Sequence, residues 1–124
     1  MVEVIIIRDD TFYCALWLRH LTDLPERNWK KICRMLQRDS RNDESTTALR
    51  EWFPVAIAKA GAALLIARTA YDQKYKDPAG LQKKLRAVQR EINDNLRRAV
   101  RAAERELKTL KAREETFNEM TKEI

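Results

Sequence analysis

The stretch NLRRAVRAAERELKTLKAREE, residues 95–115, decides the fold expected for this chain. It contains neither Pro nor Gly, and its Leu and Ala residues recur at steps of three and four, which is the spacing of one face of an α-helix. The same spacing extends beyond both ends of the stretch, so we predict one long helix over residues 78–120, with Pro78 in its first turn. Such a helix would be about 60 Å long, and we expect its distal part to project from a small domain.

The apolar positions of this long helix predict a single buried stripe. They are Leu81, Leu85, Val88, Ile92, Leu96, Ala99, Ala103, Leu107, Leu110 and Phe117. Their steps follow an eleven-residue repeat, which predicts a nearly straight stripe or a slight right-handed coil. Because a small core cannot cover so long a stripe, we expect self-association through its far end, at Leu107, Leu110 and Phe117.

Two shorter segments have the same helical spacing. Residues 12–21 and 25–37 each place apolar side chains on one face, and Pro25 separates them because proline ends one helix but suits the first turn of the next. In the second segment the predicted buried face is formed by Trp29, Ile32, Cys33 and Leu36. Asp10 or Thr11 is the expected N-cap of the first segment.

Residues 46–76 form the third predicted helix, with Ser45 or Thr46 as its N-cap. Apolar residues surround its central part on nearly every side, so we expect neighbouring helices to enclose it. Pro54 either kinks this helix or marks its true start. Ahead of the helices, residues 1–9 contain a β-branched run and predict a short extended arm. That arm needs a partner strand, for which another molecule is one source.

Length and composition support an all-α fold. The chain has 124 residues, which is typical of one domain, and its 2 Gly and 3 Pro are too few for the frequent turns of an all-β fold. We therefore predict a single domain over residues 1–124. It would be a small bundle of about four helices, with one long C-terminal helix and the short N-terminal arm.

The positive charge is concentrated on two predicted helix faces. Lys and Arg number 25 against 19 Asp and Glu, a net charge of +6 that favours anionic partners. One stripe lies opposite the apolar face of residues 25–37 and consists of Arg27, Lys31, Arg34 and Arg38. The other lies opposite the apolar face of the long helix and consists of Lys83, Arg86, Arg90, Arg97, Arg101 and Lys108. Arginines one turn apart, such as Arg97 and Arg101, repel each other mildly, which a helix selected only for stability would avoid.

Two functions fit these stripes. The first is a non-catalytic subunit of a larger nucleoprotein assembly that binds the backbone of RNA or DNA without sequence preference. Arg and Lys would neutralise phosphates there and read no base sequence. The second is a protein–protein adaptor or inhibitor, of the kind carried by phages and mobile elements, that docks on an acidic protein surface. If neither holds, the stripes are ordinary solvated helix faces.

No catalytic or cofactor-binding pattern stands out. The sequence contains no GxGxxG, no P-loop and no nucleophile elbow, so we expect neither enzymatic activity nor a cofactor. His20, Cys14 and Cys33 lack metal-ligand spacing, and we predict that the two cysteines are buried free thiols in a reducing compartment. The three tryptophans lie on apolar faces, where we expect core or interface packing rather than base stacking; they are Trp17, Trp29 and Trp52.

The localisation expected from the sequence is cytoplasmic. The first residues lack the charge and length pattern of a signal peptide. The most apolar long stretch, residues 53–67, is shorter than the ~20 residues of a bilayer span and contains Lys59. We therefore expect no membrane partner, and an assembly with RNA or DNA and with other subunits or copies of the chain itself.

Overall fold

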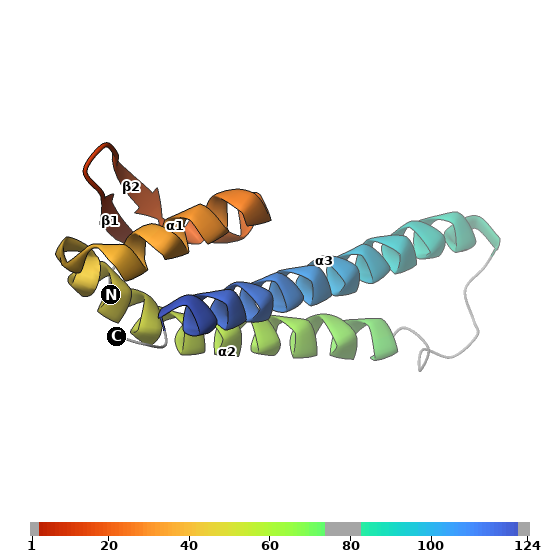
Figure 1. The fold of residues 1–124 in the computed structure, drawn as a ribbon. Helices are drawn as coiled ribbons and strands as arrows, with labels where there is room; N and C mark the ends of the chain where they lie inside the picture. The colour runs from red at the N-terminus through yellow and green to blue at the C-terminus, as the bar shows by residue number, and fades with distance from the viewer. Residues whose placement is uncertain (1–2, 74–82, 122–124) are drawn as a thin grey trace. The chain divides into compact units, whose positions relative to one another are not determined.

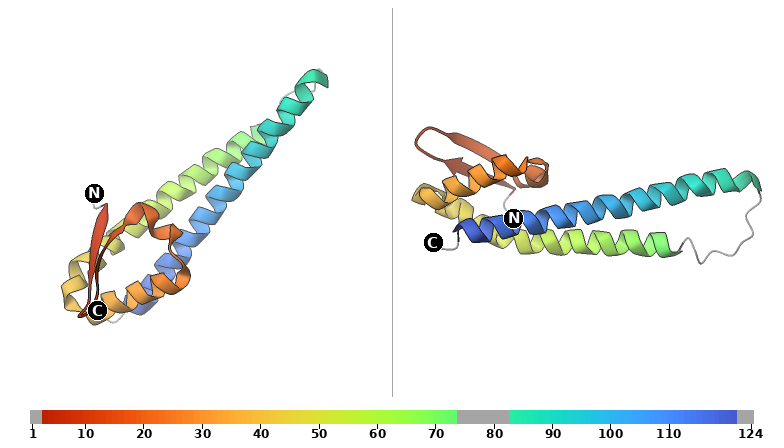
Figure 2. Two further views of the ribbon diagram at one scale, coloured as in Figure 1. Left: turned by 90° about the horizontal axis from the view of Figure 1, so that it is seen from above. Right: turned by 45° about the vertical axis from the view of Figure 1, so that its right-hand side comes forward.

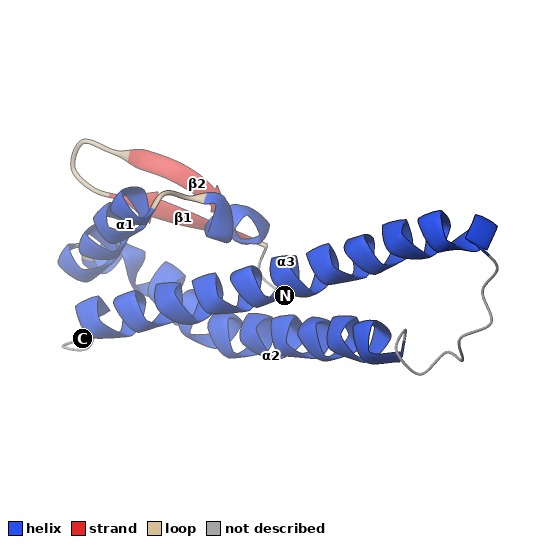
Figure 3. Cartoon of the chain, turned by 90° about the vertical axis from the view of Figure 1, so that its right-hand side faces the viewer, coloured by secondary structure: helices blue, strands red, loops and turns tan. Residues whose placement is uncertain are grey.

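The computed structural model describes residues 3–73 and 83–121, and for residues 83–89 the backbone alone. The elements in chain order are strands β1 (Val4–Arg8) and β2 (Tyr13–Trp17), the 3-10 turn η1 (Leu18–Asp23), helix α1 (Glu26–Arg38), the 3-10 turn η2 (Ser40–Asn42), and helices α2 (Asp43–Gln73) and α3 (Lys83–Thr121) (Figures 1 and 3). The described chain is mostly helical and has the predicted long C-terminal helix, but it also has a small two-stranded sheet. Its contacts divide it into two units, one of Met1–Ile57 with Thr109–Ile124 and one of Ala58–Lys108.

The N-terminal hairpin corrects the prediction of an isolated arm followed by a helix. β1 pairs antiparallel with β2, so the extended arm finds its partner strand within the chain. At the turn, the Asp9 carboxylate accepts hydrogen bonds from the Thr11 N–H at 2.6 Å and the Thr11 hydroxyl at 3.1 Å. The Asp9 N–H donates to the Phe12 carbonyl at 2.8 Å. Asp9 therefore closes a turn at the place where Asp10 or Thr11 was expected to cap a helix.

Buried and more exposed side chains alternate along the hairpin, as in a sheet that is covered on one face. Ile5, Ile7 and Leu16 are buried on the inner face, whereas Tyr13 and Trp17 are 66% and 46% exposed on the outer face. α1 packs against β1, and Figure 2 shows the hairpin beside this helix. The inner face of the hairpin thus belongs to the core of the first unit.

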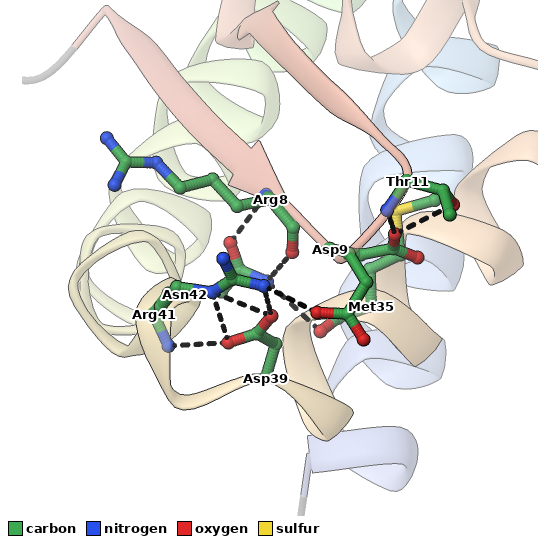
Figure 4. Close-up of polar contacts among 8 residues, drawn as sticks. Arg8, Asp9, Thr11, Met35, Asp39, Arg41 and Asn42 are labelled. Atoms are coloured by element: carbon green, nitrogen blue, oxygen red, sulfur yellow. Dashed lines mark hydrogen bonds and ion pairs between the residues drawn. The ribbon is translucent and has the colours of Figure 1, made fainter.

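Asn42 fastens β1 to the end of α1 (Figure 4). Its side chain is fully buried, and its Oδ1 accepts a hydrogen bond from the Arg8 N–H at 2.7 Å. Its Nδ2 donates to the Arg8 carbonyl at 2.6 Å and to the Met35 carbonyl at 3.1 Å. Nearby, hydrogen bonds from Arg41 hold the pKa of the Asp39 carboxyl below its usual value. The Asn42 side chain therefore forms hydrogen bonds with backbone groups of β1 and α1, and these bonds satisfy its own buried amide.

α1 has the buried face that the sequence predicts, and its bounds differ by one residue at each end from the predicted range 25–37. It begins directly after Pro25, which is its N-cap residue. The buried side chains of this helix are Trp29, Ile32, Cys33, Met35 and Leu36. The spacing of three and four residues thus selected the correct face, with Met35 as an addition.

Aromatic rings fill the core of the first unit. The Phe53 ring centroid lies 6.0 Å from that of Trp29, 5.1 Å from that of Trp52 and 5.7 Å from that of Phe117. The Trp29 indole N–H also donates to the Arg113 carbonyl at 3.0 Å, and the Arg113 guanidinium donates to a backbone carbonyl before α1 at 2.9 Å. These contacts join α1, the first part of α2 and the last part of α3.

The far end of the long helix is part of this core. Leu110 and Phe117 are 3% and 0% exposed, and Leu107 is half-buried. The expectation of an exposed apolar end is therefore wrong at Leu110 and Phe117, and the Phe53 ring packs against that of Phe117. Whether the chain self-associates stays a prediction, but Leu110 and Phe117 are not free to form the interface.

The buried stripe of α3 in the second unit differs from the predicted one. Between residues 90 and 108, the side chains that are not exposed are Asn93, Leu96, Val100, Ala103 and Leu107. Their steps alternate between three and four, which is a heptad spacing rather than an eleven-residue repeat. Ile92 and Ala99, which were expected in the stripe, are exposed. α2 lies beside α3 in this unit, where Arg68 and Glu104 form an ion pair at 3.2 Å.

α2 begins earlier than predicted and is less enclosed. It starts at Asp43 and continues through Pro54. Ser45 and Thr46 are buried inside its first turns, so neither is its N-cap. Only Ala60 and Leu64 are buried in the part of α2 that belongs to the second unit, whereas Leu65 and Ile66 are exposed by 67% and 71%. The described residues do not enclose this helix.

Both cysteines are free, and their environments predict different reactivity. Cys33 is fully buried and Cys14 is half-buried. Burial raises the pKa of the Cys33 thiol to about 12, and the Arg113 charge opposes this rise only in part. At pH 8 we expect iodoacetamide to modify Cys14 but not Cys33 in the folded protein, and to modify both in denaturant. Mass spectrometry after digestion reads this directly, and equal labelling of both thiols in the folded state would contradict the buried position of Cys33.

Candidate nucleic-acid interface

The α1 basic stripe consists of the exposed side chains of Arg27, Lys31, Arg34 and Arg38. The amphipathic sequence of α1 fixes their direction, because Trp29, Ile32 and Leu36 occupy the opposite face and are buried. The structure therefore confirms the exposed placement of this stripe, although it does not test what binds there.

The charges of the α1 basic stripe are largely unopposed. Glu26 is the only acidic residue of α1, and it pairs with Lys30 at 3.5 Å rather than with the stripe. Across the described ranges, residues 3–73 and 83–121, no carboxylate forms an ion pair with Arg27, Arg34 or Arg38. The stripe thus presents positive charge to solvent instead of forming an internal ion-pair network.

A surface hollow adjoins the stripe at the hairpin turn. Lys31, Arg34 and Arg38 line one part of it, and Asp9, Asp10 and Asp39 line another. Arg41 pairs with Asp39 at 2.6 Å and with Asp10 at 3.1 Å, while the Asp9 carboxylate accepts from Thr11 and keeps its charge. The hollow therefore holds both signs of charge, although none of its three basic side chains forms an ion pair within the described residues.

The α3 basic stripe lies on the second unit. Its described side chains are Arg90, Arg97, Arg101 and Lys108, and all four are exposed. The side chains of Lys83 and Arg86 lie outside the described residues, although the helix itself begins at Lys83. Asp94, one turn from both Arg90 and Arg97, places an acid beside this face, so the α3 basic stripe is less uniform than that of α1.

Three exposed aromatic rings on the hairpin were not predicted. The cations of Arg8, Arg19 and Lys31 lie 5.6, 4.9 and 5.5 Å from the ring centroids of Tyr13, Trp17 and Phe12, respectively. The sequence pattern predicts an apolar helix face for Trp17, whereas this side chain is 46% exposed on β2. If residues 13–17 are taken as a strand, the alternation of their side chains predicts that Tyr13 and Trp17 lie on the same, solvent-exposed face.

The potential metal ligands of the described residues are the His, Cys, Asp and Glu side chains. No three His, Cys, Asp or Glu side chains are grouped there so that they could hold a metal ion. His20 is exposed, with its Nδ1 3.4 Å from a carboxylate oxygen of Asp23. This pair is a surface contact.

One helical segment, Ser40–Gln73, is long and apolar enough to cross a membrane by length and composition. The same criterion is met by core helices of proteins that never enter a bilayer. In this segment 17% of the most apolar window is buried inside the structure.

The chain matches no protein family, no curated protein and no solved structure.

Proposed function

We propose that this protein is a non-catalytic subunit that binds the backbone of RNA or DNA without sequence preference and acts beside other protein subunits or copies of itself. The observation that carries the proposal is the α1 basic stripe, in which Arg27, Arg34 and Arg38 are exposed and have no ion-pair partner among the described residues. A helix face of this kind is typical of phosphate binding, because each cation can release counterions from a nucleic-acid backbone.

The geometry of the stripe suits an extended anion. Arg27 and Arg38 are eleven positions apart on one helix, which corresponds to about 16 Å at the rise of an α-helix. That length covers several consecutive phosphates of one strand. Arg predominates in the stripe, and its planar guanidinium suits bidentate contact with phosphate. Contacts with phosphates position a protein on a nucleic acid but carry no base sequence.

The α3 basic stripe supplies a second set of contacts in this proposal. Its members are Lys83, Arg86, Arg90, Arg97, Arg101 and Lys108. Repulsion between neighbouring members falls when a phosphate lies between them, which gives a reason for their spacing. The proposed site of action is the cytoplasm, since free thiols such as Cys14 and Cys33 are typical of a reducing compartment.

A second candidate function is docking on an acidic protein surface. It is favoured by the exposed rings of Tyr13 and Trp17, each accompanied by an arginine. Tyr, Trp and Arg are the residue types most enriched at the centres of protein–protein interfaces. In this alternative the same basic side chains would pair with carboxylates of the partner.

Neutralising the α1 basic stripe tests the first proposal. In the variant Arg27→Gln/Arg34→Gln/Arg38→Gln, we expect the affinity for short single-stranded and duplex oligonucleotides to fall by about tenfold or more at low salt. The fall should be similar for all base sequences, and the salt dependence should become shallower by about one unit for each lost phosphate contact. Fluorescence anisotropy titrations at several salt concentrations measure both quantities. Gln is a good helix former, so α1 should stay folded.

The matched control removes the same charge elsewhere. Lys59, Arg98 and Arg105 are exposed and lie outside both stripes, so their joint replacement by Gln should leave most of the affinity intact. An equal loss in this control would assign binding to net charge rather than to the stripe. If the unmodified protein binds no oligonucleotide at low salt, the proposal fails, and docking on an acidic protein becomes the first candidate.

A further inference from the structure

The hydrogen-bond pattern of the hairpin shows which backbone groups face away from it. In an antiparallel pair, hydrogen-bonded rows alternate with rows that are not hydrogen-bonded. The Asp9 N–H donates to the Phe12 carbonyl at one end of the hairpin, and the Leu18 N–H donates to the Glu3 carbonyl at the other. With the observed register, this alternation directs the outward N–H and C=O groups to the even-numbered residues of β1 and the odd-numbered residues of β2.

Side chains occupy the outer edge of β1 at Arg8 and Ile6. Asn42 accepts from the Arg8 N–H and donates to the Arg8 carbonyl, and the Ser45 hydroxyl donates to the Ile6 carbonyl at 2.5 Å. These bonds satisfy outward groups of β1 from within the chain. With the groups next to the turn occupied, this edge is less suited to accept another strand than an edge without such bonds.

The outer edge of β2 is open. Its outward backbone groups belong to Tyr13, Ala15 and Trp17. Among the residues that the structure describes, the groups of Tyr13 and Ala15 and the Trp17 N–H have no hydrogen-bond partner, whereas the Trp17 carbonyl belongs to the N-cap of η1 and accepts the first bond of that helix. The strand itself, YCALW, contains no charged residue and no proline, which are the usual guards of an exposed edge. All three of these residues are also exposed to solvent through their side chains.

We propose that β2 pairs with β2 of a second copy of this chain, antiparallel about a two-fold axis at Ala15, so that two hairpins form one four-stranded sheet. In this register Ala15 faces Ala15 of the second copy, and Tyr13 faces Trp17 of the second copy. The free outward groups of the three residues then find partners, which gives about four new hydrogen bonds, because the Trp17 carbonyl of each copy stays with η1.

The side chains make a second copy the best occupant of this edge. Along β2 the outward side chains of Tyr13, Ala15 and Trp17 are aromatic, small and aromatic, and this order is the same in both strand directions. One antiparallel register therefore places each exposed Tyr13 beside an exposed Trp17. Facing aromatic residues are among the favourable cross-strand pairs. Ala15 is small enough to leave room for the rings on either side of it. An unrelated peptide would need a matching pattern, whereas a second copy already has it.

Charge sets the conditions under which the pairing forms. Arg8 and Arg19 lie over the rings of Tyr13 and Trp17 and form no ion pair within the described residues. Two copies bring these cations closer together, so salt should strengthen the pairing by screening their repulsion. Salt weakens binding to nucleic acid. The two proposals therefore respond to salt in opposite directions, and the failure of one is distinguishable from the failure of the other.

Cross-linking tests the register. In a Cys14→Ala background, the variant Ala15→Cys places two thiols in one hydrogen-bonded row, with Cα atoms about 5.5 Å apart, within the about 4.4–6.8 Å that a disulfide spans. We expect oxidation at tens of micromolar protein to yield a covalent dimer. The control Ser40→Cys in the same background places a thiol on exposed η2 and should stay monomeric. Failure of the Ala15→Cys variant to cross-link would overturn the proposed register.

Sedimentation equilibrium tests the pairing itself. The unmodified protein should show a dimer whose share rises with salt. In the variant Ala15→Pro the dimer should be lost while circular dichroism stays unchanged, because the N–H removed faces away from β1. The double variant Tyr13→Thr/Trp17→Thr keeps strand-forming residues and should dimerise more weakly. An unmodified protein that stays monomeric at high salt, or a dimer that survives Ala15→Pro, would overturn the proposal. The latter result would assign association to the exposed side of α2 at Leu65 and Ile66 instead.

Discussion

Replacing Phe53 with Ala is expected to lower the free energy of unfolding by about 3–5 kcal/mol, the usual cost of deleting a buried aromatic side chain. Phe53 is 1% exposed, and its ring contacts those of Trp29, Trp52 and Phe117, which come from three different helices. The cavity left by the ring cannot close without moving α1 and α3 together. Urea unfolding followed by tryptophan fluorescence measures the loss, because two of the contacting residues are tryptophans.

The matched control for Phe53→Ala is the same substitution at a surface ring. Phe12 is 39% exposed and lies at the hairpin turn, under the Lys31 ammonium group. Phe12→Ala should cost about 1 kcal/mol or less. Similar losses for both variants would mean that Phe53 is not the centre of a packed core, and that the joining of α1, α2 and α3 depends on other contacts.

The helices were predictable where their own sequence decides their faces. α1 carries apolar residues at steps of three and four and charged residues between them, so any packed fold buries Trp29 and exposes Arg34. The α1 basic stripe followed from the same pattern without knowledge of the neighbours. Local periodicity was sufficient there because a single helix has only one apolar side.

The hairpin was not predictable from spacing alone. Residues 13–17 fit both a helical and a strand pattern, since Tyr13, Leu16 and Trp17 share a helix face while Cys14 and Leu16 share a strand face. The choice was made by the Asp9 turn and by pairing with β1, which are interactions beyond the segment. Consequently the open edge and its exposed rings also escaped prediction, although they carry the strongest inference about a partner.

The stripe of α3 shows a second limit of sequence patterns. Ile92 and Ala99 are apolar, yet Asn93 and Val100 are turned inward in their place. The rotation of a helix is set by the neighbour against which it packs, and a heptad spacing follows when that neighbour is another helix at a shallow angle. Leu110 and Phe117 illustrate the same point, because residues distant in sequence bury them. The charge of the α3 face was predictable, but its partner in packing was not.

Replacing Asn42 with Ala is expected to lower the free energy of unfolding by about 2–4 kcal/mol, since it removes three hydrogen bonds to buried or part-buried backbone groups. These groups are the Arg8 N–H, the Arg8 carbonyl and the Met35 carbonyl. The loss should be concentrated in the hairpin, because Asn42 occupies the outer edge of β1 at Arg8. Hydrogen exchange should therefore accelerate at the amides of Ile5 and Ile7 more than at those in the middle of α3.

A second substitution at the same position separates hydrogen bonding from packing. Asn42→Asp keeps the size of the side chain and an acceptor for the Arg8 N–H, but it directs a carboxylate oxygen at the carbonyls of Arg8 and Met35. We expect this variant to be at least as destabilised as Asn42→Ala near neutral pH, because a buried charge then faces two acceptors. Ser40→Ala, on the exposed surface of η2, should change stability by about 0.5 kcal/mol or less. A mild effect of Asn42→Asp would show that the two donated hydrogen bonds matter little and that Asn42 acts through its volume and the bond that it accepts from the Arg8 N–H.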